Sequence, residues 1–156
     1  MTKDDIKFMN LAINEAKKAG QKDEVPVGAV LVSGSGDILS QSHNQVITFA
    51  DPTAHAEIWA LREAAIKVSN YRLLSTTLYV TIEPCVMCMG AIVHARVARV
   101  VFGANDLKWG AAGSLYNFAD DTRLNHRPEI ISGVCRDECR ELIQDFFRSK
   151  RMRSAQ

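Results

Sequence analysis

Residues 76–88 have the sequence Thr76-Thr77-Leu78-Tyr79-Val80-Thr81-Ile82-Glu83-Pro84-Cys85-Val86-Met87-Cys88. The first half is rich in β-branched and aromatic residues, which predicts a strand over 76–82. Pro84 then predicts the beginning of a helix that extends to about Ala95, because proline suits the first turn of a helix. A further strand is predicted at 99–102, so this unit has the strand–helix–strand order that is typical of a parallel sheet.

The flanking chain predicts further elements of the same kind. Apolar residues at helical spacing, Ile6, Met9, Ile13 and Ala16, predict a first helix over 3–19. A β-branched, apolar segment at 27–32 precedes a Ser/Gly-rich turn, after which 38–42 returns as a second strand, so the two predict a hairpin. The remaining predicted elements are a helix over 51–68 that begins at Asp51-Pro52, a weak strand over 129–131 and a helix over 136–150. This order favours an α/β fold with a mixed five-stranded sheet and helices on both faces.

Composition and charge limit the class of protein. The 156 residues are 47% hydrophobic and 24% charged, as in globular proteins, and their number fits a single domain over 1–156. A formal net charge of +1 excludes a polycation that coats nucleic acid indiscriminately, but it permits a local basic patch. The longest apolar run, 25–32, is shorter than the roughly 18 residues that a membrane span needs, and the acidic N-terminus lacks a signal-peptide pattern. We therefore expect a cytoplasmic protein with no membrane segment.

Four residues predict a metal centre with an adjacent carboxylate: His55, Glu57, Cys85 and Cys88. One imidazole and two thiolates suit a tetrahedral zinc ion and leave its fourth position open, as in catalytic zinc sites. The two cysteines are three residues apart at a helix start, so they share a face near the helix dipole that favours thiolates. His55 and Glu57 are about 200° apart around a helix, so they share a pocket only across its first turn. Glu57 could then take a proton from zinc-activated water, which predicts hydrolytic chemistry.

Simpler interpretations exist for each of these residues. Cys-x-x-Cys also occurs in redox pairs and in closed zinc knuckles, a lone histidine is usually a core residue, and a helical glutamate is usually exposed. The combination favours a catalytic zinc site. A non-catalytic, zinc-stabilised binding module remains open and requires a fourth protein ligand, with Cys135, Cys139 and His43 as the candidates. We expect Cys135 and Cys139 to be buried thiols of the last helix.

The motifs resemble a known family. His55-Ala56-Glu57 followed by Pro84-Cys85-x-x-Cys88 is the pattern of zinc-dependent nucleoside and nucleobase deaminases. The resemblance to the bacterial tRNA-specific adenosine deaminases extends from Glu24 to Arg148 and includes 51–57, 71–73, 78–88, 113–115 and 125–127. It implies a three-layer α/β/α cytidine-deaminase-like fold, one zinc ion per subunit and a homodimer. It also implies deamination of adenosine to inosine at the wobble position of a tRNA anticodon, typically in the anticodon stem-loop of an arginine tRNA.

The same resemblance implies roles for particular residues. Zinc would be held by His55, Cys85 and Cys88, and Glu57 would shuttle protons. The implied substrate contacts are Asn44, Val27, Ile47 and the Ala56 backbone at the base, Asp106 near a neighbouring sugar, and the loop Asn125-His126-Arg127 on the RNA side. Without the resemblance these would be a turn-forming asparagine, core residues, a loop acid and a solvated turn.

The C-terminal segment 148–156 begins with the basic run Arg148-Ser149-Lys150-Arg151-Met152-Arg153. Such clustering suits phosphate contact along an anticodon stem, with Arg148 and Arg151 as candidates, although basic residues also suit a solvated helix end. Trp109 departs from the family pattern, in which small or polar residues are usual. It could stack on a loop base or cover the core.

A small-molecule deaminase, acting on guanine, cytosine or deoxycytidylate, is the alternative function. It would use the same zinc chemistry. The basic segment and the 125–127 loop favour tRNA over this alternative, because a free base needs neither.

Overall fold

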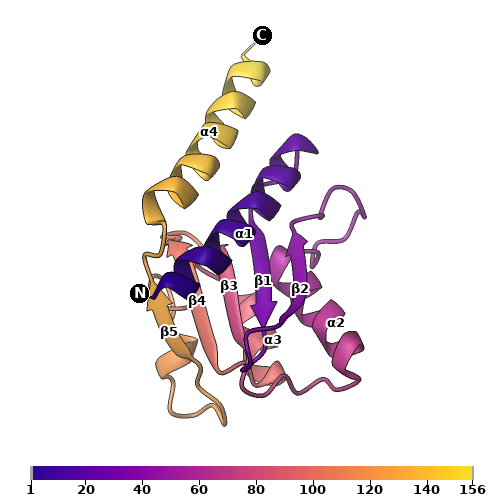
Figure 1. Cartoon of the computed structure of the whole chain (residues 1–156). Helices are drawn as coiled ribbons and strands as arrows, with labels where there is room; N and C mark the ends of the chain where they lie inside the picture. Colours follow the sequence, from indigo (N-terminus) through magenta and orange to yellow (C-terminus); the bar gives the residue numbers. More distant parts are fainter. Residues whose placement is uncertain (1, 156) are drawn as a thin grey trace.

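A mixed five-stranded sheet forms the middle layer of the molecule (Figure 1). The computed structural model describes residues 2–155, so Met1 and Gln156 at the ends of the predicted domain lie outside the described residues. The sheet has the order β2-β1-β3-β4-β5. Its strands are β1 (Gly28–Val32), β2 (Ile38–His43), β3 (Thr77–Ile82), β4 (Arg99–Ala104) and β5 (Glu129–Ser132). β1 is antiparallel to β2 and β3, whereas β3, β4 and β5 are parallel, which confirms the hairpin and the mixed sheet.

Helices cover both faces of the sheet, as Figure 1 shows. α1 (Lys3–Gln21) and α4 (Arg136–Ser154) pack on one face, and α2 (Ala56–Val68) and α3 (Val86–Ala95) pack on the other. Strand residues alternate between two cores, so that Val30 and Tyr79 face α1 whereas Leu31 and Leu78 face α2 and α3. The predicted three-layer α/β/α fold is confirmed. On α1, Ile6 was expected on the buried face but is 40% exposed.

The predicted zinc ligands and Glu57 lie at one edge of the sheet. β2 and β3 run parallel, because both are antiparallel to β1, and each is followed by a helix. Both connections therefore leave from the same edge, and α2 and α3 begin there. The turn before α2, the start of α3 and the loop after β4 meet at this edge.

α2 begins at Ala56 rather than at the predicted Asp51-Pro52. The carboxylate of Asp51 accepts hydrogen bonds from the backbone nitrogen (2.8 Å) and hydroxyl (2.7 Å) of Thr53, which closes a separate turn. The first free N–H of the helix, on Ala56, instead donates to Asn44 Oδ1 at 2.7 Å. His55 occupies the N-cap position of α2, but its side chain makes no capping hydrogen bond. The imidazole therefore remains available to the site.

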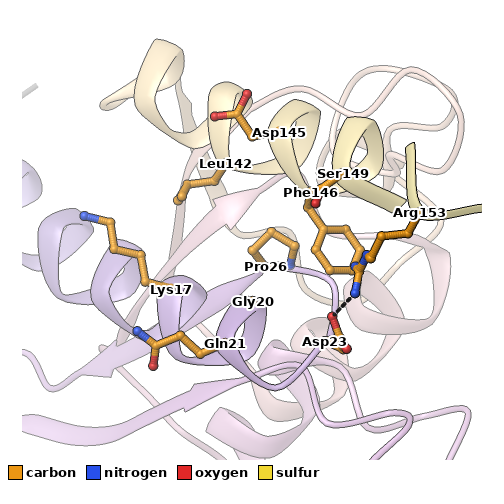
Figure 2. Close-up of a pocket in the computed structure, with 10 residues that line it drawn as sticks. All are labelled: Lys17, Gly20, Gln21, Asp23, Pro26, Leu142, Asp145, Phe146, Ser149 and Arg153. Carbon is orange, nitrogen blue, oxygen red and sulfur yellow. Dashed lines mark hydrogen bonds and ion pairs between the residues drawn. The ribbon is translucent and has the colours of Figure 1, made fainter. Parts of the chain in front are cut away.

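α4 extends beyond the edge at which β3, β4 and β5 end (Figure 1). Its first turns are held by Cys139, which is buried against Gly103, as expected for a structural thiol. An open groove with a volume of about 600 Å³ lies between α1 and α4, and an ion pair of 3.2 Å between Arg153 and Asp23 bridges it. Figure 2 shows the residues that line this groove. None of the predicted zinc ligands lines this groove. Within residues 2–155, no helix combines the length and apolar character needed to cross a bilayer.

Candidate metal centre and active site

The side chains of His55, Cys85 and Cys88 converge at the shared edge. His55 stands at the N-cap of α2, Cys85 stands at the N-cap of α3, and Cys88 lies in the first turn of α3. His55 Nδ1 lies 3.7 Å from Cys85 Sγ and 3.5 Å from Cys88 Sγ, and the three ligand atoms are all within 4.8 Å of one another. Ordinary zinc–sulfur and zinc–nitrogen bonds in a tetrahedron give separations of about 3.6 Å. The donor set therefore fits a zinc ion.

The protonation of the two cysteines is already unequal. A hydrogen bond from the Cys88 thiol lowers the pKa of Cys85 to about 4, with a further contribution from His55. The same bond and deep burial raise the pKa of Cys88, and the hydrogen bond with Cys85 raises the pKa of His55. The fold thus favours the thiolate form of Cys85, while metal binding would displace the remaining protons.

Glu57 lies beside these ligands in the first turn of α2. It is 3% exposed, and burial raises the pKa of its carboxyl, although its own backbone N–H and the nearby His55 partly oppose this effect. Its Oε1 atom is buried without a hydrogen-bond partner among residues 2–155. A buried carboxylate oxygen of this kind is costly unless a further group meets it. The expectation that His55 and Glu57 share a pocket across one helical turn agrees with this placement.

A closed zinc module would need a fourth ligand from the protein. In the described part of the chain, the cluster contains three ligand residues. Cys139 is packed on the opposite face of the sheet, and Cys135 stands at the start of α4. His43 lies 3.7 Å from Glu15 and 3.5 Å from Lys22. The three candidates for a fourth ligand therefore lie outside the His55, Cys85 and Cys88 cluster.

Asn44 lies next to the metal centre and its amide orientation is fixed. The residue is buried, and its Oδ1 accepts the Ala56 N–H, so the amide must present Nδ2 as a donor. Val27 is 5% exposed and its carbonyl accepts the Asn44 N–H at 3.1 Å. The structure thus brings Asn44, Val27 and Ala56 together, while Ile47 is 66% exposed on the adjoining loop. Their contacts with substrate stay predictions.

Asp106 organises the loop that follows β4. One carboxylate oxygen, Oδ1, accepts the backbone N–H groups of Lys108 and Trp109, both at 3.1 Å. Asp106 therefore stabilises its own loop, as the interpretation of a loop acid predicts. The predicted contact with a sugar can use only the other oxygen.

The structure does not bring the remaining predicted RNA contacts to the metal centre, and 125–127 lies at the opposite edge of the sheet, ahead of β5. His126 is half-buried, and its Nε2 lies 2.6 Å from the carbonyl oxygen of Val97, whereas Asn125 and Arg127 are exposed. Arg148 and Arg151 are exposed on the projecting part of α4, where Arg148 also pairs with Asp145 at 3.1 Å. These roles too stay predictions.

Two buried glutamates hold the loops of the site, and sequence reasoning missed both. Glu24 accepts hydrogen bonds from the backbone of Ile47 and from the backbone and hydroxyl of Thr48. Glu83 accepts hydrogen bonds from the loop after β4, through the backbone of Asp106, Ala112 and Ser114 and the side chains of Asn105 and Ser114. Burial raises the pKa of each carboxyl, but these donors outweigh it and hold both values below the ordinary range. The only sequence signal for Glu83 was a charge at the end of a buried strand.

Comparisons with known proteins agree with this geometry. The profile of the cytidine and deoxycytidylate deaminase zinc-binding region matches residues 2–104. The tRNA-specific adenosine deaminase of Haemophilus influenzae is 51% identical over 94% of this chain and 85% of that protein. The tRNA-specific adenosine deaminase of Bacillus subtilis is 48% identical over 97% of this chain and 92% of that protein.

A solved structure from a study of A-to-I editing by tRNA:A34 deaminases at the wobble position of transfer RNA has the same fold. It superposes with a TM-score of 0.84 and 43% identity, covering 87% of this chain and 98% of that chain. The region that the profile matches, residues 2–104, contains the three predicted zinc ligands and Glu57. The chain therefore belongs to the zinc-dependent cytidine and deoxycytidylate deaminase family, and within it to the tRNA-specific adenosine deaminases.

Proposed function

We propose that this protein deaminates adenosine to inosine at the wobble position of a tRNA anticodon, with one zinc ion per subunit. The observation that carries the proposal is the buried, unpartnered Oε1 of Glu57 beside a three-ligand His/Cys/Cys group. Such a group leaves one coordination position for the reaction. The similarity to tRNA-specific adenosine deaminases supports adenosine in tRNA as the substrate.

Glu57 is the proton carrier of the reaction. His55, Cys85 and Cys88 would hold the zinc ion, which would supply Lewis-acid activation of water. Glu57 accepts a proton from the attacking water and returns it to the amino nitrogen, so that a carbon–oxygen bond forms, the carbon–nitrogen bond breaks and ammonia leaves. Asn44, with Nδ2 fixed as a donor by Ala56, orients the base through one of its acceptor atoms.

The proposed RNA contacts lie at both edges of the sheet. Arg148 and Arg151 are exposed where α4 projects beyond the edge that contains the site, and we assign them to phosphates of the anticodon stem. The exposed Asn125 and Arg127, with His126 beside Val97, lie ahead of β5 at the opposite edge of the sheet, so their predicted contact with RNA lies away from the metal site of this chain. The wobble base is unpaired in the anticodon loop, so it enters the site at a lower cost than a base in a duplex.

Three finer statements rest on family similarity. The protein acts as a homodimer, its substrate is an arginine tRNA, and it works in the cytoplasm, where tRNA is used. Each can be tested separately from the chemistry.

The decisive experiment uses the zinc-loaded protein and a tRNA transcript with adenosine at the wobble position. Sequencing after incubation should report guanosine at that position, because inosine pairs as guanosine does. Parallel reactions with free guanine, cytosine and deoxycytidylate, followed by ammonia release, test the small-molecule alternative. Turnover of a free base with an unchanged anticodon would overturn the proposal in favour of that alternative.

A further inference from the structure

Trp109 is a large aromatic side chain with no place in the core. It is 67% exposed, and so is not the core-covering residue that its sequence position allowed. Its neighbours in the loop, Leu107 and Lys108, are exposed as well. An exposed indole is a feature of binding surfaces, where tryptophan supplies a large contact area with few rotatable bonds.

The backbone of this loop lies directly against a zinc ligand. Gly110 pairs with Cys85 in an antiparallel β-bridge, and the Ala111 N–H donates to the Pro84 carbonyl at 2.8 Å. Trp109 is thus one residue from the partner of Cys85. Cys85 and His55 are half-buried, whereas Cys88 and Glu57 are fully buried. Cys85 is thus the more accessible of the two thiols, and the backbone of the loop next to Trp109 lies against it.

The loop is held in place before any substrate arrives. Glu83 accepts hydrogen bonds from its backbone at Asp106, Ala112 and Ser114. A side chain at position 110 would overlap the Glu83 carboxylate, so only glycine fits there. The Trp109 N–H is itself fixed by Asp106 Oδ1. A fixed backbone reduces the ordering cost of binding at the indole.

We propose that Trp109 is a stacking platform for an unpaired nucleobase that neighbours the target base in the RNA substrate. The proposal rests on the proposed function, since it requires a single-stranded loop at the metal site. Unpaired bases have exposed faces, and stacking on an aromatic ring is tolerant of base identity. The adjacent exposed cation of Lys108 suits the phosphate that joins such a base to its neighbour.

Tryptophan fluorescence tests this contact directly, because the chain contains two tryptophans. Trp59→Phe, at a half-buried position in α2 packed against Phe49, leaves Trp109 as the single reporter. Titration of this zinc-loaded variant with an anticodon stem-loop RNA should quench its emission at saturation. In the wild-type background, Trp109→Ala should raise the Kd and KM for this RNA about tenfold while kcat stays near its original value. Trp109→Phe, which keeps a stacking ring, should restore most of the affinity.

Leu107→Ala is the matched control, because Leu107 is 82% exposed in the same loop and has no aromatic face. It should bind the RNA with wild-type affinity. The platform is overturned by unquenched emission at saturating RNA, by wild-type affinity of Trp109→Ala, or by an affinity loss that accompanies a change in oligomeric state in sedimentation. If the wild-type protein still converts the wobble adenosine, any of these results disproves the stacking role of Trp109 and leaves the proposed function in place. Absence of wild-type conversion removes the proposed function together with this role.

Discussion

Glu57 is buried beside three metal ligands, yet it is not one of them. Glu57→Ala should therefore retain zinc and fold while losing turnover, because the proton between water and the leaving amine then has no carrier. We expect kcat to fall by about 10²–10⁴-fold. Zinc content by metal analysis, measured together with inosine formation, separates the two effects. Loss of the metal in this variant would make Glu57 a ligand and the proposed mechanism wrong.

Glu83 presents both carboxylate oxygens to N–H and hydroxyl donors of the loop after β4. Glu83→Gln keeps the size of the side chain but turns an amide donor towards donors that need an acceptor. The free energy of unfolding should fall by about 2 kcal/mol, as for other buried donors left unpaired. Urea denaturation measures this change, with Glu141→Gln on the exposed surface of α4 as the control. Equal losses in the two variants would contradict the role of Glu83.

At the scale of elements, the last turns of α4 are mostly exposed. Removal of the segment after Phe147 should leave the core intact, since Cys139 and Leu142 remain against the sheet. It should weaken binding of tRNA and reduce the dependence of log Kd on log salt by about one unit for each phosphate that the shortened helix no longer reaches. Filter binding at several salt concentrations measures this slope. An unchanged slope would make the basic segment an ordinary solvated helix end.

The elements show what sequence can predict here and what it cannot. The five strands and four helices follow local periodicity, and the zinc ligands follow a short spacing at helix starts. The predicted start of α2 at Asp51-Pro52 was wrong, because these residues also form turns. α2 begins instead at Ala56, where Asn44 from another segment accepts the first free N–H of the helix. Glu24 and Glu83 have loop partners more than 20 residues away. No local pattern specifies such pairs, since they exist only after the strands assemble.

At the scale of the whole molecule, one buried polar group links the outer layer to the sheet. Asp5 of α1 accepts a hydrogen bond of 2.8 Å from the Tyr79 hydroxyl on β3, and Arg99 of β4 lies 3.5 Å from the same carboxylate. Asp5 and Tyr79 are 1% and 3% exposed. Burial raises the pKa of Asp5, but Tyr79, Thr2 and Arg99 together hold it below its ordinary value. Burial and Asp5 raise the pKa of Tyr79 to about 12.

These two shifts predict a loss of stability at both ends of the pH range. The unfolded chain takes up the Asp5 proton at a higher pH than the folded chain does, so this contribution is complete above pH 3.8 and is lost as pH falls through the folded pKa. The Tyr79 contribution is complete below pH 10 and is lost as pH rises towards 12, because the unfolded chain ionises first.

Urea unfolding of zinc-loaded protein across this range, with each variant compared with the wild type at the same pH, isolates the two groups. The acid loss should be reduced in Asp5→Asn, and the alkaline loss in Tyr79→Phe. Asp4→Asn, at an exposed carboxylate in the same turn of α1, is the matched control. If both variants lost stability by a constant amount at every pH, the link between the layers would be one of packing rather than of charge.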